Sequence, residues 1–146
     1  MTRATLVVIA LALAASVPAA DGKAEAKLKK PHLELRATPR MAFSPVNILL
    51  TAELQGGDDV EEYYCPQLEW DWDDGGKSVQ EGDCAPFVAG TTKIERRFTA
   101  EHEYRRAGSY NVKVTMRRAN RSLAASTVHI TVRAGLGDRT MERPSS

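Results

Sequence analysis

Three aspartates, at positions 71, 73 and 74, precede a pair of glycines near the middle of the chain. Carboxylate oxygens on a tight turn are the ligands that Ca²⁺ prefers. The spacing misses the D-x-D-x-D-G pattern of a calcium loop by one position, and strand alternation would direct Asp71 away from the turn. The sequence therefore favours a structural turn, with a calcium-binding extracellular domain that uses Asp71, Asp73 and Asp74 as the alternative.

Histidines and acids are present, but they form no recognisable catalytic constellation. A hydrolytic triad needs a Ser or Cys nucleophile beside a His and an acid. The three histidines, at positions 32, 102 and 129, accompany neither a nucleophile-elbow motif nor a glycine-rich phosphate loop. We therefore predict a non-catalytic protein that needs no cofactor.

Cys65 and Cys84 are the only cysteines of the chain. Two cysteines cannot complete a zinc site alone, and no histidine lies at ligand spacing from them. An even number of cysteines in an exported protein favours a disulfide, with two free thiols as the alternative. A bridge would close a loop of about 20 residues and stabilise the fold by roughly 3 kcal/mol on the chain-entropy model.

The N-terminus has the form of a secretory signal. One arginine precedes an uncharged apolar stretch at residues 4–15, and small residues follow at 16–20. This pattern predicts a cleaved signal peptide over residues 1–20, with an uncleaved anchor as the alternative. A flexible polar leader is expected at residues 21–30 and a loose tail at 135–146. We expect a secreted or periplasmic protein that is not held in a membrane after cleavage.

Charge argues against nucleic acid as a partner. Twenty Lys and Arg stand against nineteen Asp and Glu, for a formal net charge of +1. Nucleic-acid binding needs a surplus of cations that displaces counterions. The charge is nevertheless divided along the chain, because residues 56–85 hold ten acids and one base, whereas residues 86–146 hold twelve bases and five acids.

Residues 31–134 alternate between apolar and polar side chains with a period of two. The alternation is clear at residues 33–37, 46–54, 68–72, 110–116 and 128–132. Each stretch predicts a half-buried strand, and Ile94 with Phe98 suggests another whose pattern Arg96 interrupts. Six or seven short strands separated by turn residues, in about 100 residues, predict an all-β fold, namely an antiparallel β-sandwich in one domain.

Two motifs in this segment match a known module. One reads Trp70-Asp71-Trp72-Asp73-Asp74-Gly75, and the other extends from His102 to Val114. Together they resemble the PKD domain, the immunoglobulin-like module named after the polycystic kidney disease protein, whose pattern is roughly W-x-F-G-D-G followed by H-x-Y-x-x-x-G-x-Y-x-V. The matching positions are Trp70, Trp72 (in place of Phe), Asp74, Gly75, His102, Tyr104, Gly108, Tyr110 and Val112. Asp73 replaces the usual glycine.

The resemblance implies an immunoglobulin-like β-sandwich of about seven strands in which the motif residues are structural. Trp70 would fill the core, and Asp74 with Gly75 would form a turn. Tyr110 would form a tyrosine corner, in which its hydroxyl ties a loop to the strand. Val112 stands where antibody-like domains have their second cysteine. The inter-sheet disulfide of those domains is therefore absent. The Cys65–Cys84 bridge would be a different one, and it would brace the insertion after the strand of Trp70, residues 73–92, against the loop before that strand.

The fold implied by the resemblance also places opposite charges on neighbouring strands. The strand of Glu69 would lie beside the strand of Lys113 and Arg117, and opposite charges across strands are mildly favourable. We therefore expect the acidic and basic segments to screen each other. A bipolar surface that selects a partner by charge complementarity is the alternative.

The resemblance finally implies a binding function, because PKD-like domains are usually attached to extracellular enzymes or surface proteins. We expect an unidentified protein or carbohydrate as the partner. A carbohydrate platform needs exposed aromatic rings, and the candidates are Tyr63, Tyr64 and Phe87, near the proposed bridge. Packing of these rings on the core is the alternative. Asn120-Arg121-Ser122 is also a glycosylation sequon on the predicted last hairpin turn.

Overall fold

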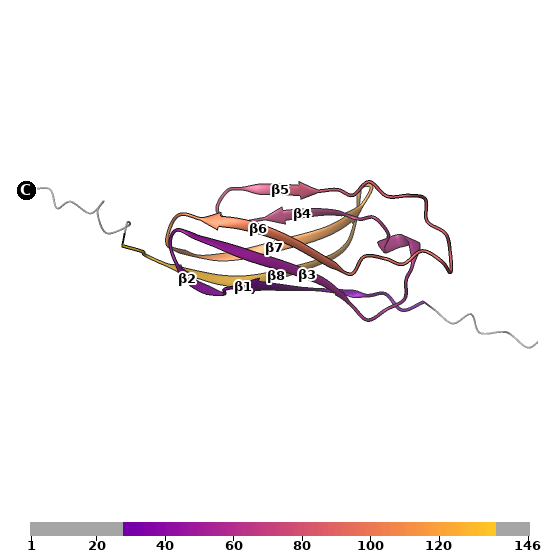
Figure 1. Ribbon diagram of the computed structural model, residues 1–146, viewed down its shortest axis with the longest axis horizontal. Coiled ribbons are helices and arrows are strands. Elements are labelled where there is room, and N and C mark those ends of the chain that lie inside the picture. The colour runs from indigo at the N-terminus through magenta and orange to yellow at the C-terminus, as the bar shows by residue number, and fades with distance from the viewer. Residues whose placement is uncertain (1–27, 137–146) are drawn as a thin grey trace, which may run out of the picture.

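The alternating segments form strands in the computed structural model, which describes residues 28–136 (Figure 1). Within this range the elements are β1 (His32–Thr38), β2 (Met41–Phe43), β3 (Val46–Gln55), the 3₁₀ helix η1 (Glu61–Tyr63), β4 (Gln67–Asp71), β5 (Lys77–Gln80), β6 (Arg97–Tyr104), β7 (Gly108–Arg118) and β8 (Arg121–Arg133). The predicted signal peptide, most of the leader and most of the tail lie outside the described residues.

The strands are divided between two sheets that face each other. One sheet has the order β1-β3-β6, and the other has the order β2-β8-β7-β4-β5. All pairings are antiparallel except that of β2 with β8, which is parallel. This is the all-β, immunoglobulin-like sandwich expected from the sequence, with one more strand in the described residues than the seven that were anticipated.

The core lies between the sheets and is formed by alternate residues of the long strands. On β7, for example, Val112, Val114 and Met116 are fully buried, whereas Asn111 and Lys113 between them are exposed. Leu33, Leu35 and Ala37 of β1 are buried in the same way, each below 10% exposure. The strand period of two therefore explains which side chains are inside.

The two sheets are unequal, and this leaves one strand without cover. β1 lies against β8, and His102 and Tyr104 of β6 contact Trp72 directly after β4. The three-stranded sheet thus ends with β6 above β4. β5, the next strand of the five-stranded sheet, lies past this edge and has no strand above it in the described residues. All four residues of β5 are exposed, which is why their sequence carries no apolar alternation.

In residues 28–136 no helix is long and apolar enough to cross a membrane.

Candidate functional site

The Cys65–Cys84 disulfide braces one end of the sandwich. The bond joins the loop before β4 to the segment after β5, with 6.1 Å between the two Cα atoms. The Tyr64 hydroxyl donates a hydrogen bond of 2.8 Å to the carbonyl oxygen of Ala85, next to the bridge. The disulfide expected from the sequence is therefore confirmed. Together with the Tyr64 hydrogen bond, it fixes the segment after β5 against the loop before β4.

The three candidate aromatic rings do not form a single platform. Tyr63 is 3% exposed and belongs to the core, so its proposed place on a binding surface is wrong. The turn of η1 directs Tyr63 inward and leaves the next residue, Tyr64, at the surface. Tyr64 and Phe87 are half-buried and in contact, with 5.4 Å between their ring centroids. The braced end therefore presents one aromatic pair.

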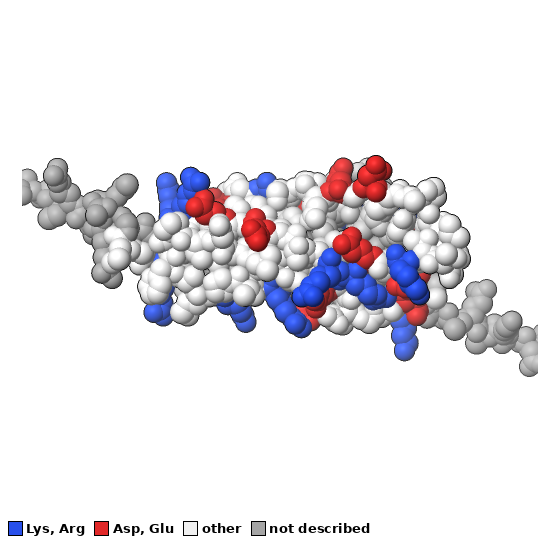
Figure 2. Space-filling view, in the orientation of Figure 1, with Lys and Arg blue, Asp and Glu red and all other residues white. Residues whose placement is uncertain are grey.

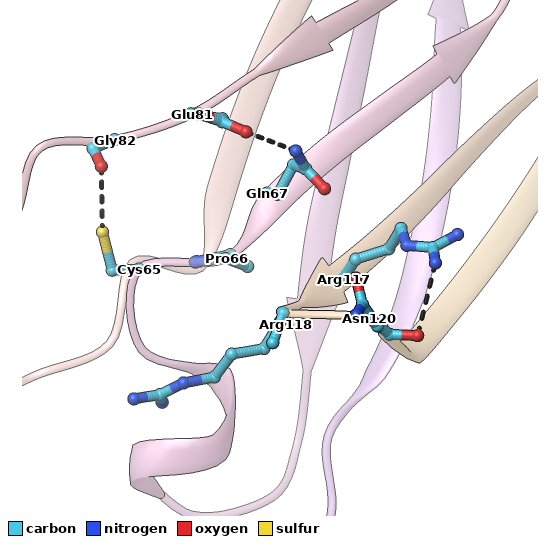
Figure 3. Close-up of a pocket in the computed structure, with 9 residues that line it drawn as sticks. Cys65, Pro66, Gln67, Glu81, Gly82, Arg117, Arg118 and Asn120 are labelled. Carbon is cyan, nitrogen blue, oxygen red and sulfur yellow. Dashed lines mark hydrogen bonds between the residues drawn. The ribbon is translucent and has the colours of Figure 1, made fainter.

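A polar hollow of about 330 Å³ lies beside the bridge (Figure 3). Its walls come from the braced segments and from the β7–β8 turn, and its lining residues are Cys65, Pro66, Gln67, Glu81, Gly82, Arg117, Arg118, Ala119 and Asn120. On one side of the hollow the Gln67 amide donates a hydrogen bond to Glu81, and on the other the Arg117 guanidinium donates one of 3.4 Å to the Asn120 carbonyl (Figure 3). Hydrogen-bonding groups of this kind suit hydroxyls, amides or a carboxylate.

The two cysteines predict the bridge, but the sequence gives no sign of the hollow beside it. Gln67, Glu81 and Arg117 lie far apart in the chain, and no local pattern distinguishes them. Asn120 was noted only as part of a sequon, and the structure places it, exposed, in the β7–β8 turn at the edge of the hollow. The pairing of β4 with β5 and with β7, and of β7 with β8, brings these side chains together.

Ion pairs near this end join the acidic segment to the basic one, as the screening interpretation predicted. The pairs are Arg121–Glu62, Arg118–Glu61, Lys93–Asp59 and Arg96–Asp59. Lys30, which precedes β1, also pairs with Glu62. Figure 2 shows basic and acidic atoms in contact over this part of the molecule. The hydrogen bond from Arg96 is the main reason that the pKa of Asp59 lies below its usual range.

The predicted pairing of charges across β4 and β7 is also present. Asp71 is opposite Lys113 in the register, and Arg117 Nη1 lies 3.4 Å from a Glu69 carboxylate oxygen. These contacts are at the surface, where a single pair contributes on the order of 0–1 kcal/mol. Together with the pairs above, they join four of the ten acids of residues 56–85, namely Asp59, Glu61, Glu62 and Glu69, to bases of residues 86–146.

The motif residues form a connected cluster at the opposite end of β4. Trp70 and Trp72 are 1% and 4% exposed, with 5.5 Å between ring centroids. The imidazole of His102 stacks on Trp72, and the buried Tyr104 hydroxyl donates to the Trp72 carbonyl at 2.9 Å. Burial raises the pKa of the Tyr104 hydroxyl above its ordinary value, so the phenol remains a donor.

Asp74 completes this cluster through His102. A carboxylate oxygen of Asp74 lies 2.7 Å from His102 Nε2, and the other accepts the Gly76 N–H at 2.9 Å. Burial alone would raise the pKa of Asp74, but these hydrogen bonds and the His102 charge outweigh it and hold the pKa below its usual range. Gly75 has a φ of +90°, a conformation that glycine adopts without strain.

Tyr110 forms the corner that the resemblance implied. Its hydroxyl donates to the Arg106 carbonyl at 2.8 Å, and its ring lies 4.4 Å from that of Tyr104. A side chain at Gly108 would meet the Tyr110 ring at 3.0 Å, which explains the glycine there. Val112 is fully buried below this corner.

The three aspartates of the acidic turn are directed to three different partners. Asp71 pairs with Lys77 at 3.1 Å, Asp73 accepts the Asn111 N–H at 2.7 Å, and Asp74 contacts His102. The hydrogen bond from Lys77, with that from the Asp73 N–H, lowers the pKa of Asp71. Within residues 28–136 no group of three or more His, Cys, Asp or Glu side chains is placed to hold a metal ion.

Comparison with known proteins agrees with this geometry. The family model described as "PKD domain" matches residues 32–132. Among solved structures, the chain is similar to the PKD domain of an M14-like peptidase from a Thermoplasmatales archaeon, with a TM-score of 0.49 and 14% identity over 72% of this chain and 97% of that one. It is also similar to a superoxide reductase (neelaredoxin) from Ignicoccus hospitalis, with a TM-score of 0.43 and 11% identity over 71% and 82%. No curated protein matches the chain.

Proposed function

Because the chain belongs to the PKD domain family, we propose that it is a non-catalytic, secreted or periplasmic module that binds a protein or a carbohydrate through its disulfide-braced end. Domains of this family are generally extracellular-type binding modules. A disulfide persists in oxidising compartments, and this supports an extracellular or periplasmic location.

One observation carries the choice of surface: the aromatic pair of Tyr64 and Phe87 is partly exposed on a segment that the disulfide holds in place. A ring that is already fixed loses little conformational entropy when a ligand packs on it. The adjacent hollow supplies polar groups for hydrogen bonds. Aromatic rings beside polar groups are the usual composition of sites for sugars and for polar protein surfaces.

The experiment measures the binding of the wild type, of a double variant and of a control variant to panels of purified polysaccharides and of secreted proteins. The Tyr64→Ala/Phe87→Ala double variant should bind its target about tenfold more weakly than the wild type, since removal of an aromatic anchor costs on the order of 1–2 kcal/mol. Phe43→Ala is the matched control, because Phe43 is 64% exposed but belongs to β2, away from the bridge. Equal retention of wild type and double variant would remove this end as the binding surface.

A further inference from the structure

One strand position in the sandwich is open. The three-stranded sheet ends at β6, and β5 extends beyond it in the facing sheet. Ser78 and Gln80 of β5 are opposite the inward residues Trp70 and Leu68, so they share the inner side of their sheet, yet both are exposed. Among residues 28–136 no strand pairs with the second side of β6. The position beside β6 and over β5 therefore lacks a strand.

The backbone of β6 is arranged to bond at this position. The Leu54 N–H donates to the Arg96 carbonyl, which makes these two residues a hydrogen-bonded pair of the β3–β6 ladder. Such pairs alternate along an antiparallel ladder, so Phe98, Ala100 and His102 direct their N–H and C=O groups toward β3. Arg97, Thr99, Glu101 and Glu103 consequently direct theirs away from β3, to the open side. A row of outward donors and acceptors is a template for another strand.

The facing sheet excludes a second copy of the chain as the added strand. In each copy β4 lies beneath β6 and β5 lies one position beyond it. If two copies paired through β6, the β4 of one would fall on the position that β5 of the other already holds. A single extended segment has no second layer and avoids this clash. The occupant is therefore an isolated peptide strand.

Charge indicates the chemistry of that strand. The side chains of β6 that alternate on the outer face are Arg97, Thr99, Glu101 and Glu103. Arg97 pairs with Glu53, and Glu103 pairs with Arg105. Within residues 28–136 Glu101 has no ion pair, nor does Glu95 just before the strand. Figure 2 shows acidic atoms over β6 that no basic atom touches.

We propose that the open position beside β6 takes an extended segment of a partner polypeptide as an added strand, with Lys or Arg on alternate residues opposite Glu101. The residues of the partner segment that alternate with its Lys or Arg residues face Ser78 and Gln80, so these residues are small or uncharged. This surface is distinct from the disulfide-braced end and does not depend on the function proposed for it.

The test uses the full, isotope-labelled chain and two capped eight-residue peptides, one alternating Lys with Thr and one alternating Glu with Thr. The Lys-Thr peptide should shift the amide resonances of Thr99, Glu101 and Glu103 and those of β5, and it should bind at least tenfold more tightly than the Glu-Thr peptide. Glu101→Lys should weaken binding of the Lys-Thr peptide about threefold or more, as expected for reversing one cross-strand charge pair. Glu34→Lys on β1 makes the same charge change at the opposite edge and should leave the affinity unchanged.

Backbone pairing is tested separately. Thr99→Pro removes an N–H that points away from β3, so it should abolish peptide binding while Thr99→Ala retains it. A Lys-Thr peptide methylated on alternate amide nitrogens gives the same test with an unaltered protein, and it should not bind. Unshifted β6 amides, equal binding of the two peptides, or equal binding of the methylated peptide would each overturn the proposal. Dimerisation of the chain that Thr99→Pro abolishes would overturn it in favour of a second copy.

Discussion

The imidazole of His102 lies flat against the indole of Trp72, with 4.4 Å between ring centroids and 1° between ring planes. His102 belongs to β6 in the three-stranded sheet, and Trp72 directly follows β4 in the five-stranded sheet. The stack therefore ties the two layers together at the end that is far from the disulfide. Asp74 fixes the orientation of the imidazole through the 2.7 Å contact to Nε2.

Replacement of His102 by alanine should destabilise the fold, because it removes both the stack on Trp72 and the partner of Asp74. We expect a loss of roughly 1–3 kcal/mol in the free energy of unfolding, measured by urea denaturation. His129→Ala is the control, since His129 is exposed and its ring nitrogen lies 3.1 Å from the Asn111 side-chain oxygen at the surface. Its cost should stay within about 0.5 kcal/mol. Equal effects of the two substitutions would contradict a structural role for the stack.

The Asp74 carboxylate should make stability depend on pH in the acid range. Its pKa is lowered in the folded protein, so its contribution is complete above the unfolded pKa, about 3.9, and is lost as the pH falls through the lower folded value. Asp74→Asn should therefore be less stable than the wild type at neutral pH, and the difference should shrink below about pH 4. Denaturation curves across this range measure it. As a control, Asp83→Asn replaces an exposed acid, and its free energy of unfolding should follow that of the wild type across this pH range.

The alternation of the sequence predicted β1, β3, β4, β7 and β8, because each has one exposed face and one buried face. Residues 110–116 of β7 illustrate this, since alternation alone placed Val112, Val114 and Met116 in the core. It indicated β6 only through Ile94 and Phe98, and Ile94 lies before the first residue of that strand. It did not predict β2 or β5. β2 has three residues, and β5 exposes every side chain, so neither carries a periodic pattern.

The site was less predictable, because its residues meet only through tertiary structure. The two cysteines predicted the bridge, but two adjacent tyrosines gave no sign that a 3₁₀ turn would bury Tyr63 and expose Tyr64. The same holds for Gln67, Glu81 and Arg117, which strand pairing brings to one hollow. The motif residues were predicted to be structural, and their packing as a cluster agrees with that expectation.

Removal of the disulfide by Cys65→Ser and Cys84→Ser should lower the free energy of unfolding by roughly 3 kcal/mol, because the bridge closes a loop of about 20 residues. For a domain of this size we expect a fall of about 10–20 °C in Tm, measured by calorimetry. A reductant should lower the Tm of the wild type toward that of the double variant and leave the variant unchanged. A wild type that melts at the same temperature with and without reductant would contradict this role.

Two tyrosine hydroxyls should differ in what their loss costs. The Tyr104 hydroxyl is buried and donates to the Trp72 carbonyl, so Tyr104→Phe leaves a buried acceptor without its donor. We expect a cost of about 1–2 kcal/mol in unfolding free energy. Tyr110→Phe removes a bond to the Arg106 carbonyl nearer the surface, where water replaces the donor, and should cost about 1 kcal/mol or less. Chemical denaturation of both variants in parallel measures the two losses of unfolding free energy. A larger loss for Tyr110→Phe than for Tyr104→Phe would contradict the prediction.

Calcium should leave the stability of the protein unchanged. A ligand that binds only the folded state raises Tm with concentration, so a specific site would be visible in millimolar Ca²⁺. The carboxylates of Asp71, Asp73 and Asp74 are instead engaged by three different partners, namely Lys77, the Asn111 N–H and His102. We expect the melting curves with Ca²⁺ and with a chelator to superimpose, and titration calorimetry to record no binding heat. A rise in Tm that Asp73→Asn abolishes would instead show that the turn rearranges around the ion.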